Sequence, residues 1–158
     1  LSRRQRQMCI RDRKDMEDAR TQMAYGLSVC DILKISDNEI QWFSGKEDYT
    51  EGIHMLQQTY QIPLILLSMG KDGSRAYYKD MLVEVPAFLQ KNTIETTGAG
   101  DTFGACCLHH ILKYGLDNLT KQQLKEMLTF ANAAASIITT RKGALRVMPS
   151  LEEIQRLL

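Results

Sequence analysis

The sequence of 158 residues lacks a long apolar run and an excess of either charge. Its longest apolar segments, such as IPLILLSM, reach less than half of the roughly 20 residues that cross a bilayer, so we expect no membrane span. Lysine and arginine number 20 against 19 acidic residues, and this net charge of +1 gives no reason to expect a nucleic-acid or membrane partner. A small neutral or anionic ligand is the better expectation.

Cysteine and proline are also scarce. The four cysteines, Cys9, Cys30, Cys106 and Cys107, have neither CxxC spacing nor the density of a disulfide scaffold, so we interpret them as reduced, mostly buried thiols of a cytoplasmic protein. No HExxH or paired CxxC indicates zinc, and no GxSxG indicates a serine nucleophile. With 44% hydrophobic residues and only 3 prolines, the composition fits one globular domain or part of a larger one.

The first thirteen residues, LSRRQRQMCIRDR, differ from the rest of the chain. They hold five arginines and a single acid, with no apolar periodicity. An Arg-rich transit peptide would also be Ser-rich, and Ser2 is the only serine in this stretch. Composition therefore favours a solvated or non-native leader over residues 1–13, followed by the domain itself over residues 14–158.

From Lys14 onward, helical and strand-like patterns alternate. The helix-like segments are residues 16–27, 36–43, 47–60, a stretch after residue 98, 124–138 and 150–158. The strand-like segments are residues 30–35, 62–69, 74–79 and 81–86. The last two strands predict a hairpin, and Ser36 with Glu39 and Ser150 with Glu153 have the spacing of helix capping boxes. This order predicts an α/β fold with a mostly parallel sheet covered on both faces.

Ligands in such folds bind beyond the carboxyl ends of strands, where loops lead into helices. TTGAGDTFGA, residues 96–105, places small residues just before a helical pattern, so that free N–H groups and the positive helix end can face an anion. If that anion is the γ-phosphoryl of ATP, Asp101 can accept a proton from an attacking hydroxyl. The alternative, which this peptide alone leaves open, is a turn in which Asp101 favours the helix dipole.

Two further loops and one helix could contact a nucleotide, although neither a Walker GxxxxGK[ST] loop nor a GxGxxG fingerprint occurs. SMGKDGS, residues 68–74, follows a buried strand but is also typical of a tight turn. Ser36 and Glu39 could lie near metal-bound water or could only cap a helix. Asn132 lies among alanines that would let a flat group rest on the helix, or it is a structural amide.

Taken in order, LSMGKDG, TIETTGAGDTFGA and FANAAASIITTRKGA resemble the C-terminal half of the PfkB family of ribokinase-like carbohydrate kinases, and most closely its fructokinases. The resemblance runs from about Lys14 to Leu158. It implies a three-layer α/β/α fold, partial here, and phosphoryl transfer from ATP to fructose, which gives ADP and fructose 6-phosphate. The N-terminal half that supplies most sugar contacts in the family is not matched, so we expect a truncated chain that is inactive alone.

The resemblance also assigns site residues. Asp101 matches the catalytic base, and Gly98, Ala99 and Gly100 match the anion hole. The positions that match the nucleotide site are Ser36, Ser68, Gly70, Lys71, Gly73, Asn132 and Gly143. Glu39 retains the acid of the family's NxxE motif and would act on Mg²⁺ through water. Glu95 and Thr97 would lie beside a monovalent cation, together with backbone carbonyls near Ile138, Arg141 and Gly143.

Two departures from the family pattern matter. Ser36 stands where many members have Asn, which favours a fructokinase, and Glu95 replaces the usual Asp, so its longer carboxylate must reach the K⁺ site. The implied ligands are ATP with Mg²⁺, K⁺ and a small sugar, and a homodimer is compatible with the resemblance. The rival hypotheses are ribose, 2-keto-3-deoxygluconate or a nucleoside as acceptor, a nucleotide-sensing module without catalysis, and a non-functional fragment.

Overall fold

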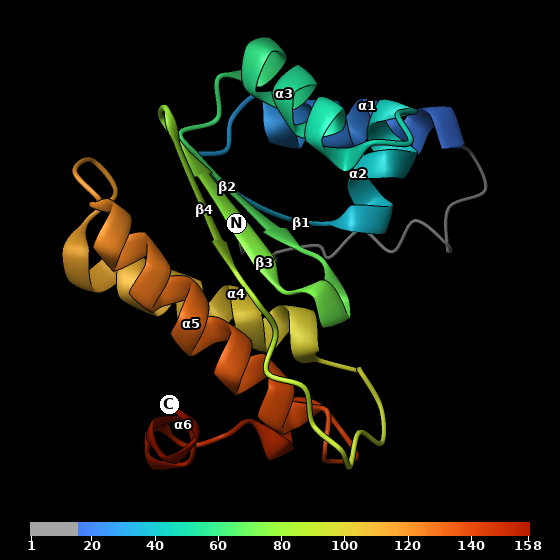
Figure 1. The fold of residues 1–158 in the computed structure, drawn as a ribbon. Helices are drawn as coiled ribbons and strands as arrows, with labels where there is room; N and C mark the ends of the chain where they lie inside the picture. Colours follow the sequence, from blue (N-terminus) through green and yellow to red (C-terminus); the bar gives the residue numbers. More distant parts are fainter. Residues whose placement is uncertain (1–15) are drawn as a thin grey trace, which may run out of the picture.

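The computed structural model describes residues 16–158, so the predicted leader over residues 1–13 lies outside the described part. The fold has three layers (Figure 1). One face of the sheet carries α1 (Met16–Leu27), α2 (Asp37–Ser44) and α3 (Tyr49–Tyr60). The opposite face carries α4 (Ala99–Tyr114) and α5 (Lys121–Ile138), and α6 (Leu151–Leu157) packs on α5. The predicted α/β/α class is confirmed.

The central sheet has four strands in the order β1 (Ile32–Ser36), β2 (Leu64–Ser68), β3 (Ser74–Tyr78) and β4 (Met81–Val85). β1 and β2 are parallel, and the two pairs β2–β3 and β3–β4 are antiparallel. The predicted hairpin is therefore confirmed. Because a single 3-10 turn, η2 (Gly70–Asp72), leads from β2 into β3, the sheet of residues 16–158 is mixed rather than mostly parallel as predicted, and its parallel part is limited to β1 and β2.

Alternate side chains of the buried strands pack on opposite faces of the sheet, as the pleat requires. In β2, Leu64 and Leu66 belong to the core beneath α4 and α5, whereas Ile65 and Leu67 belong to the core beneath α1, α2 and α3. All four leucine and isoleucine side chains are essentially inaccessible to solvent. The prediction that this strand is buried on both faces is confirmed.

The helix ends follow the caps that the sequence predicts. The Ser36 side chain accepts from Glu39 N–H while the Glu39 carboxylate accepts from Ser36 N–H, and Ser150 with Glu153 repeats the arrangement before α6. Each box satisfies backbone donors that the first helical turn leaves unpaired. The apolar residues that recur at three- or four-residue spacing in the predicted helix over residues 124–138 are buried in α5, except Ala135, which is half-buried.

The cysteines of the described range are unpaired. Cys107 is buried, Cys30 and Cys106 are half-buried, and burial raises the pKa of Cys106 to about 11. This agrees with the expected reduced thiols, and Cys9 lies outside the described residues. Among residues 16–158, none of the helices combines the length and apolar character that crossing a bilayer requires.

Candidate functional site

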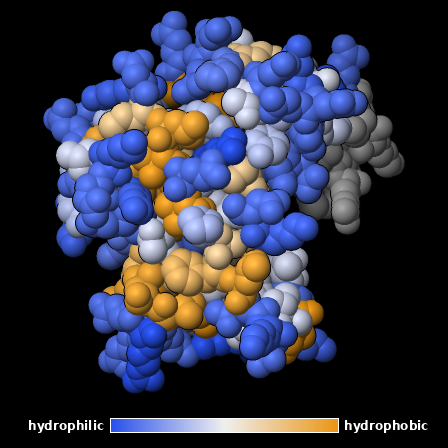
Figure 2. Space-filling model, viewed as in Figure 1, coloured by the Kyte–Doolittle hydropathy of each residue, from blue (hydrophilic) through white to orange (hydrophobic). Residues whose placement is uncertain are grey.

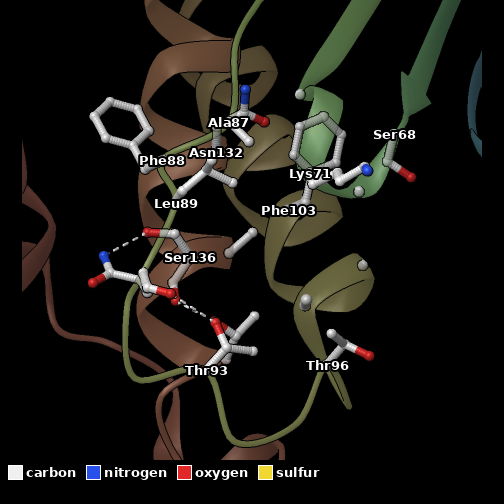
Figure 3. A pocket seen from close by; sticks show the side chains of 17 residues that line it. Ser68, Lys71, Ala87, Phe88, Leu89, Thr93, Thr96, Phe103, Asn132 and Ser136 are labelled. Carbon is white, nitrogen blue, oxygen red and sulfur yellow. Dashed lines mark hydrogen bonds between the residues drawn. The ribbon is translucent and has the colours of Figure 1, made fainter.

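A cavity of about 310 Å³ lies beside the amino end of α4 (Figure 3). Its walls come from four segments: the end of β2 with η2, the chain after β4, the first turn of α4, and the second half of α5. The volume is at the lower end of the range for small-molecule sites in proteins. Residues that are far apart in the sequence therefore enclose one ligand-sized space.

Many of the predicted site residues meet at this cavity. Those that line it are Ser68, Gly70, Lys71, Gly73, Ala99, Gly100 and Asn132. Figure 3 shows Lys71 beside Ser68 at one end, while Asn132 and Ser136 project from α5. Three motifs thus face one another across the cavity: the loop after β2, the glycine-rich turn and the alanine-rich helix. In the sequence, only their order along the chain relates them.

Polar and apolar side chains both line the cavity. Figure 3 shows Lys71 and Ser68 on one side of it and Phe88 and Leu89 on the other, with Phe103 beside Lys71. Figure 2 shows apolar side chains gathered in the lower part of the view, where Figure 1 places the chain after β4 and the end of α5. Leu89, which is 75% exposed, belongs to that chain. A flat, weakly polar group could be covered there.

The first turn of α4 is open to an anion. Gly98 precedes the helix at φ +79°, and no side chain caps it. The helical ladder starts where Thr102 N–H donates to Gly98 O at 2.9 Å, and Ala99 N–H donates to Thr96 O at 3.2 Å. A Cβ on Gly98 would lie 3.1 Å from the Ala144 Cβ, so the turn needs glycine both for its dihedral and for space.

Asp101 lies in this same first turn, one residue after Gly100, and its side chain is exposed. Gly100 lines the cavity, and Asp101 follows it in the helix without lining the cavity itself. This position fits a group that receives a proton from a hydroxyl brought up to a phosphate held there. It also fits the simpler favourable interaction of an acid with the helix dipole.

Asn132 is buried, and its side-chain amide already has partners. Nδ2 donates to Val85 O at 3.2 Å and to Pro86 O at 3.0 Å. The amide thereby fixes the chain where it leaves β4 and becomes a wall of the cavity. Asn132 is therefore a structural amide, which was one of the two interpretations left open by the sequence. It also lines the cavity.

We expect Asn132→Ala to lower the free energy of unfolding by about 1–3 kcal/mol, because the buried carbonyl of Val85 and the partly buried carbonyl of Pro86 lose their donor. Urea denaturation measures this change. Asn118→Ala, at an exposed asparagine after α4, is the control and should change stability by less than about 0.5 kcal/mol. Equal stabilities of the two variants would contradict the anchoring role.

The residues predicted to surround a monovalent cation are only partly brought together. Glu95 Oε1 accepts from Gly143 N–H at 2.7 Å, and the N–H groups of Ile94 and Glu95 both approach Thr139 O. Ile138 lies close to Gly98, since a Cβ there would be 3.3 Å from Ile138 Cδ1. Glu95, Ile138 and Gly143 thus lie behind the start of α4.

The side chain of Arg141, a residue for which only the backbone carbonyl was predicted as a ligand, does not join that group. The Arg141 guanidinium donates to Val147 O and forms an ion pair with Glu153, which directs it toward α6. Thr97 is exposed. The Arg141 N–H donates to Ile138 O at 3.1 Å, so this predicted carbonyl ligand is already an acceptor within the fold, although a carbonyl can accept twice.

Ser36 and Glu39 lie at the same sheet edge as the cavity. Ser36 is the strand partner of Ser68, but only Ser68 lines the cavity. Glu39 Oε2 accepts from Ser36 N–H at 2.8 Å, which is the capping interaction weighed against a metal role. Over residues 16–158, His, Cys, Asp and Glu side chains form no cluster of three or more that could hold a metal ion.

Sequence interpretation missed Lys34, which lies in the middle of β1. Its Nζ is 3.1 Å from the position that a Cβ on Gly100 would occupy. The signal was present in the sequence, because Lys34 is the one charged residue in the segment ILKIS.

Comparison with known proteins agrees with the architecture and the motif order. The family model described as pfkB family carbohydrate kinase matches residues 2–151. This match includes most of the stretch that we set apart as a leader, and the boundary at Lys14 stays a prediction. The matched range contains every residue assigned to the candidate site.

Curated relatives of the chain are fructokinases. Fructokinase-1 of Zea mays is 32% identical over 142 residues, which cover 90% of this chain and 44% of that protein. Fructokinase of Klebsiella pneumoniae is 33% identical over 144 residues, 90% of this chain and 46% of that protein. The chain thus spans less than half the length of these relatives.

Solved structures share the fold. Fructokinase from Vibrio cholerae O395, in its fructose-, ADP- and calcium-bound form, aligns with a TM-score of 0.81 at 24% identity over 92% of this chain and 46% of that one. Aminoimidazole riboside kinase from Salmonella enterica, complexed with aminoimidazole riboside and an ATP analogue, aligns with a TM-score of 0.81 at 21% identity over 96% and 50%. With this fold and a family match over most of its length, the chain belongs to the pfkB family of carbohydrate kinases.

Proposed function

We propose that this chain is the nucleotide-binding and catalytic part of an ATP-dependent sugar kinase with fructose as its acceptor. One observation carries the proposal: a single cavity joins an apolar region to the uncapped amino end of α4, next to Asp101. ATP has the matching shape, a flat base at one end and a chain of phosphates at the other. The similarity to fructokinases supports the choice of acceptor.

In this proposal the adenine rests between the chain after β4 and the small residues of α5, near Ala135 and Asn132. The phosphates extend along the Ser68–Gly73 turn toward Gly100. The glycines allow phosphate oxygens to approach backbone N–H groups, and the positive end of α4 stabilises charge on the γ-phosphoryl.

The reaction is an in-line displacement. The 6-hydroxyl oxygen of fructose forms a bond to the γ-phosphorus while the bond from that phosphorus to the β,γ-bridging oxygen breaks, and its electron pair leaves with ADP. Asp101 accepts the hydroxyl proton. We propose the cytoplasm as the location, because ATP and free sugars meet there, and membership of the family supports this choice.

The proposal includes two metal ions. Mg²⁺ would neutralise phosphate charge, and the residue that could hold it is Glu39, through water, because the carboxylate also caps α2. A monovalent cation would lie near Glu95 and the carbonyls around Ile138 and Gly143, where the loops already converge. Its effect would be to fix the loop that leads into the anion hole.

The test measures ATP-dependent ADP release with fructose, ribose, 2-keto-3-deoxygluconate and adenosine as acceptors. The 158-residue chain should bind ATP weakly without turnover, because most sugar contacts of the family lie in a part that the chain does not match. A longer polypeptide that contains it should turn over fructose in preference to the others. Preference for adenosine would identify a nucleoside kinase, and ATP binding without transfer would identify a nucleotide-sensing module.

A further inference from the structure

Lys34 is a charged residue in an otherwise apolar strand. Its neighbours in β1 include Leu33 and Ile35, its partner in β2 is Leu66, and its side chain is half-buried. A lysine at such a position loses part of its hydration, a loss that is offset when the ammonium group meets an anion. The partial burial of a charged side chain at this position therefore needs a chemical explanation.

The pleat of β1 directs Lys34 toward α4. Leu33 and Ile35 pack on the side of α1, α2 and α3, whereas Ile32, two residues before Lys34, packs on the side of α4 and α5. Lys34 shares the face of Ile32 because side chains alternate along a strand. The distances agree, since Nζ and Cε lie 3.1 and 3.7 Å from the position of a Cβ on Gly100.

Two positive features meet at this point, and Asp101 is the one acid in the first turn of α4. Lys34 forms neither a hydrogen bond nor an ion pair with any residue of the 16–158 range. The amino end of α4 carries its own partial positive charge and no side-chain cap. A cation beside a helix amino end is electrostatically unfavourable, and an anion bound between the two would offset this repulsion. The cavity that Gly100 lines gives such an anion access.

We propose that Lys34 binds the terminal phosphoryl group at the amino end of α4 and neutralises part of its charge during transfer. This role rests on the proposed function in that the group there would be the γ-phosphoryl of ATP. The ammonium group would donate hydrogen bonds to phosphate oxygens from the sheet, while the backbone N–H groups donate from the helix. The competing explanation is that the stem of Lys34 covers Gly100 and the ammonium group stays in water.

The experiment titrates the 158-residue chain with inorganic tripolyphosphate, ATP and adenosine, and follows binding by NMR, which detects millimolar affinities. Four proteins are compared: the unaltered chain, Lys34→Met, Lys34→Arg, and Lys125→Met, which removes an exposed lysine of α5 as a matched loss of charge. Thermal melting by circular dichroism shows whether each variant folds like the unaltered chain.

We expect Lys34→Met to weaken tripolyphosphate and ATP binding about tenfold or more, the loss that corresponds to one charge-assisted hydrogen bond. Lys34→Arg should retain most of the affinity, and adenosine binding should not change. Lys125→Met should bind like the unaltered chain. Because tripolyphosphate has no base and the assay needs no sugar, this result would stand even if no sugar were ever phosphorylated.

Three outcomes would overturn the assignment: Lys34→Met binding tripolyphosphate as tightly as the unaltered chain, Lys125→Met losing as much affinity as Lys34→Met, or an unaltered chain that binds no polyphosphate. A fall in adenosine binding along with the others would also count against it, since it would show damage to the whole cavity. The proposed function is judged separately, by transfer to fructose. The proposed function would still hold if the unaltered chain and Lys34→Met bound ATP equally and phosphoryl transfer to fructose occurred.

Discussion

Asp101→Asn lowers the turnover number by about 10²–10⁴ in a fructose-phosphorylating polypeptide that contains this chain, because general-base catalysis contributes a factor of this size. The amide has nearly the shape of the carboxylate but cannot take the proton of the attacking hydroxyl. The amino end of α4 keeps its backbone N–H groups, so the KM for ATP should change much less than turnover. Initial rates at saturating ATP and fructose measure the effect.

The control for this substitution is Asp117→Asn, which makes the same chemical change at an exposed position after α4. It should leave turnover unchanged. If Asp101→Asn keeps full turnover while both substrates are saturating, Asp101 is not the base, and its place in the first turn reflects only the helix dipole. A loss confined to the KM for ATP would instead indicate a role in nucleotide binding.

Gly73→Ala lowers the free energy of unfolding by roughly 3 kcal/mol or more, through backbone strain and steric overlap together. Gly73 has φ +100°, and a Cβ there would lie 2.2 Å from Val85 O and 2.8 Å from Pro86 Cα. These are backbone atoms of the neighbouring strand end, so relief requires β3 and β4 to separate. The same movement would shift a wall of the cavity, and nucleotide binding should fall with stability.

Gly104→Ala provides the matched control in urea denaturation. A Cβ at Gly104 meets nothing within 4 Å, and the residue lies inside α4, where alanine is the better helix former. We therefore expect Gly104→Ala to stabilise the chain by about 0.5–1 kcal/mol. Similar unfolding free energies for the two variants would show that the turn after β2 adapts, contrary to the close approach described above.

Local signals in the sequence predicted local structure well. The Ser36–Glu39 and Ser150–Glu153 boxes start helices where expected, because a cap depends on residues only three positions apart. The apolar spacing along α5 likewise identified its buried face. The mixed character of the sheet was harder to foresee, since it depends on how tightly η2 turns the chain back beside β2.

The parts of the site that sequence interpretation missed depend on distant pairings. Asn132 binds carbonyls at Val85 and Pro86, 47 and 46 residues away, and no local pattern fixes which carbonyls those are. The contact between Glu95 and Gly143 is of the same kind. Lys34 could have been found from the sequence, because a lone charge in a buried strand requires an explanation, but its proximity to Gly100 follows only from the packing of α4 on the sheet.

The chain after β4 is fastened to α5 at both ends, through Asn132 to Pro86 O and through Ser136 Oγ, which accepts from Gln90 Nε2 at 3.2 Å. Phe88, between these ties, packs against buried residues of α5 and α6. A wall held in this way has little conformational freedom to lose when a ligand arrives. The entropic cost of ordering this wall therefore arises during folding and not during binding. The affinity for a base beside Phe88 should thus depend more on how well the base fits than on loop closure.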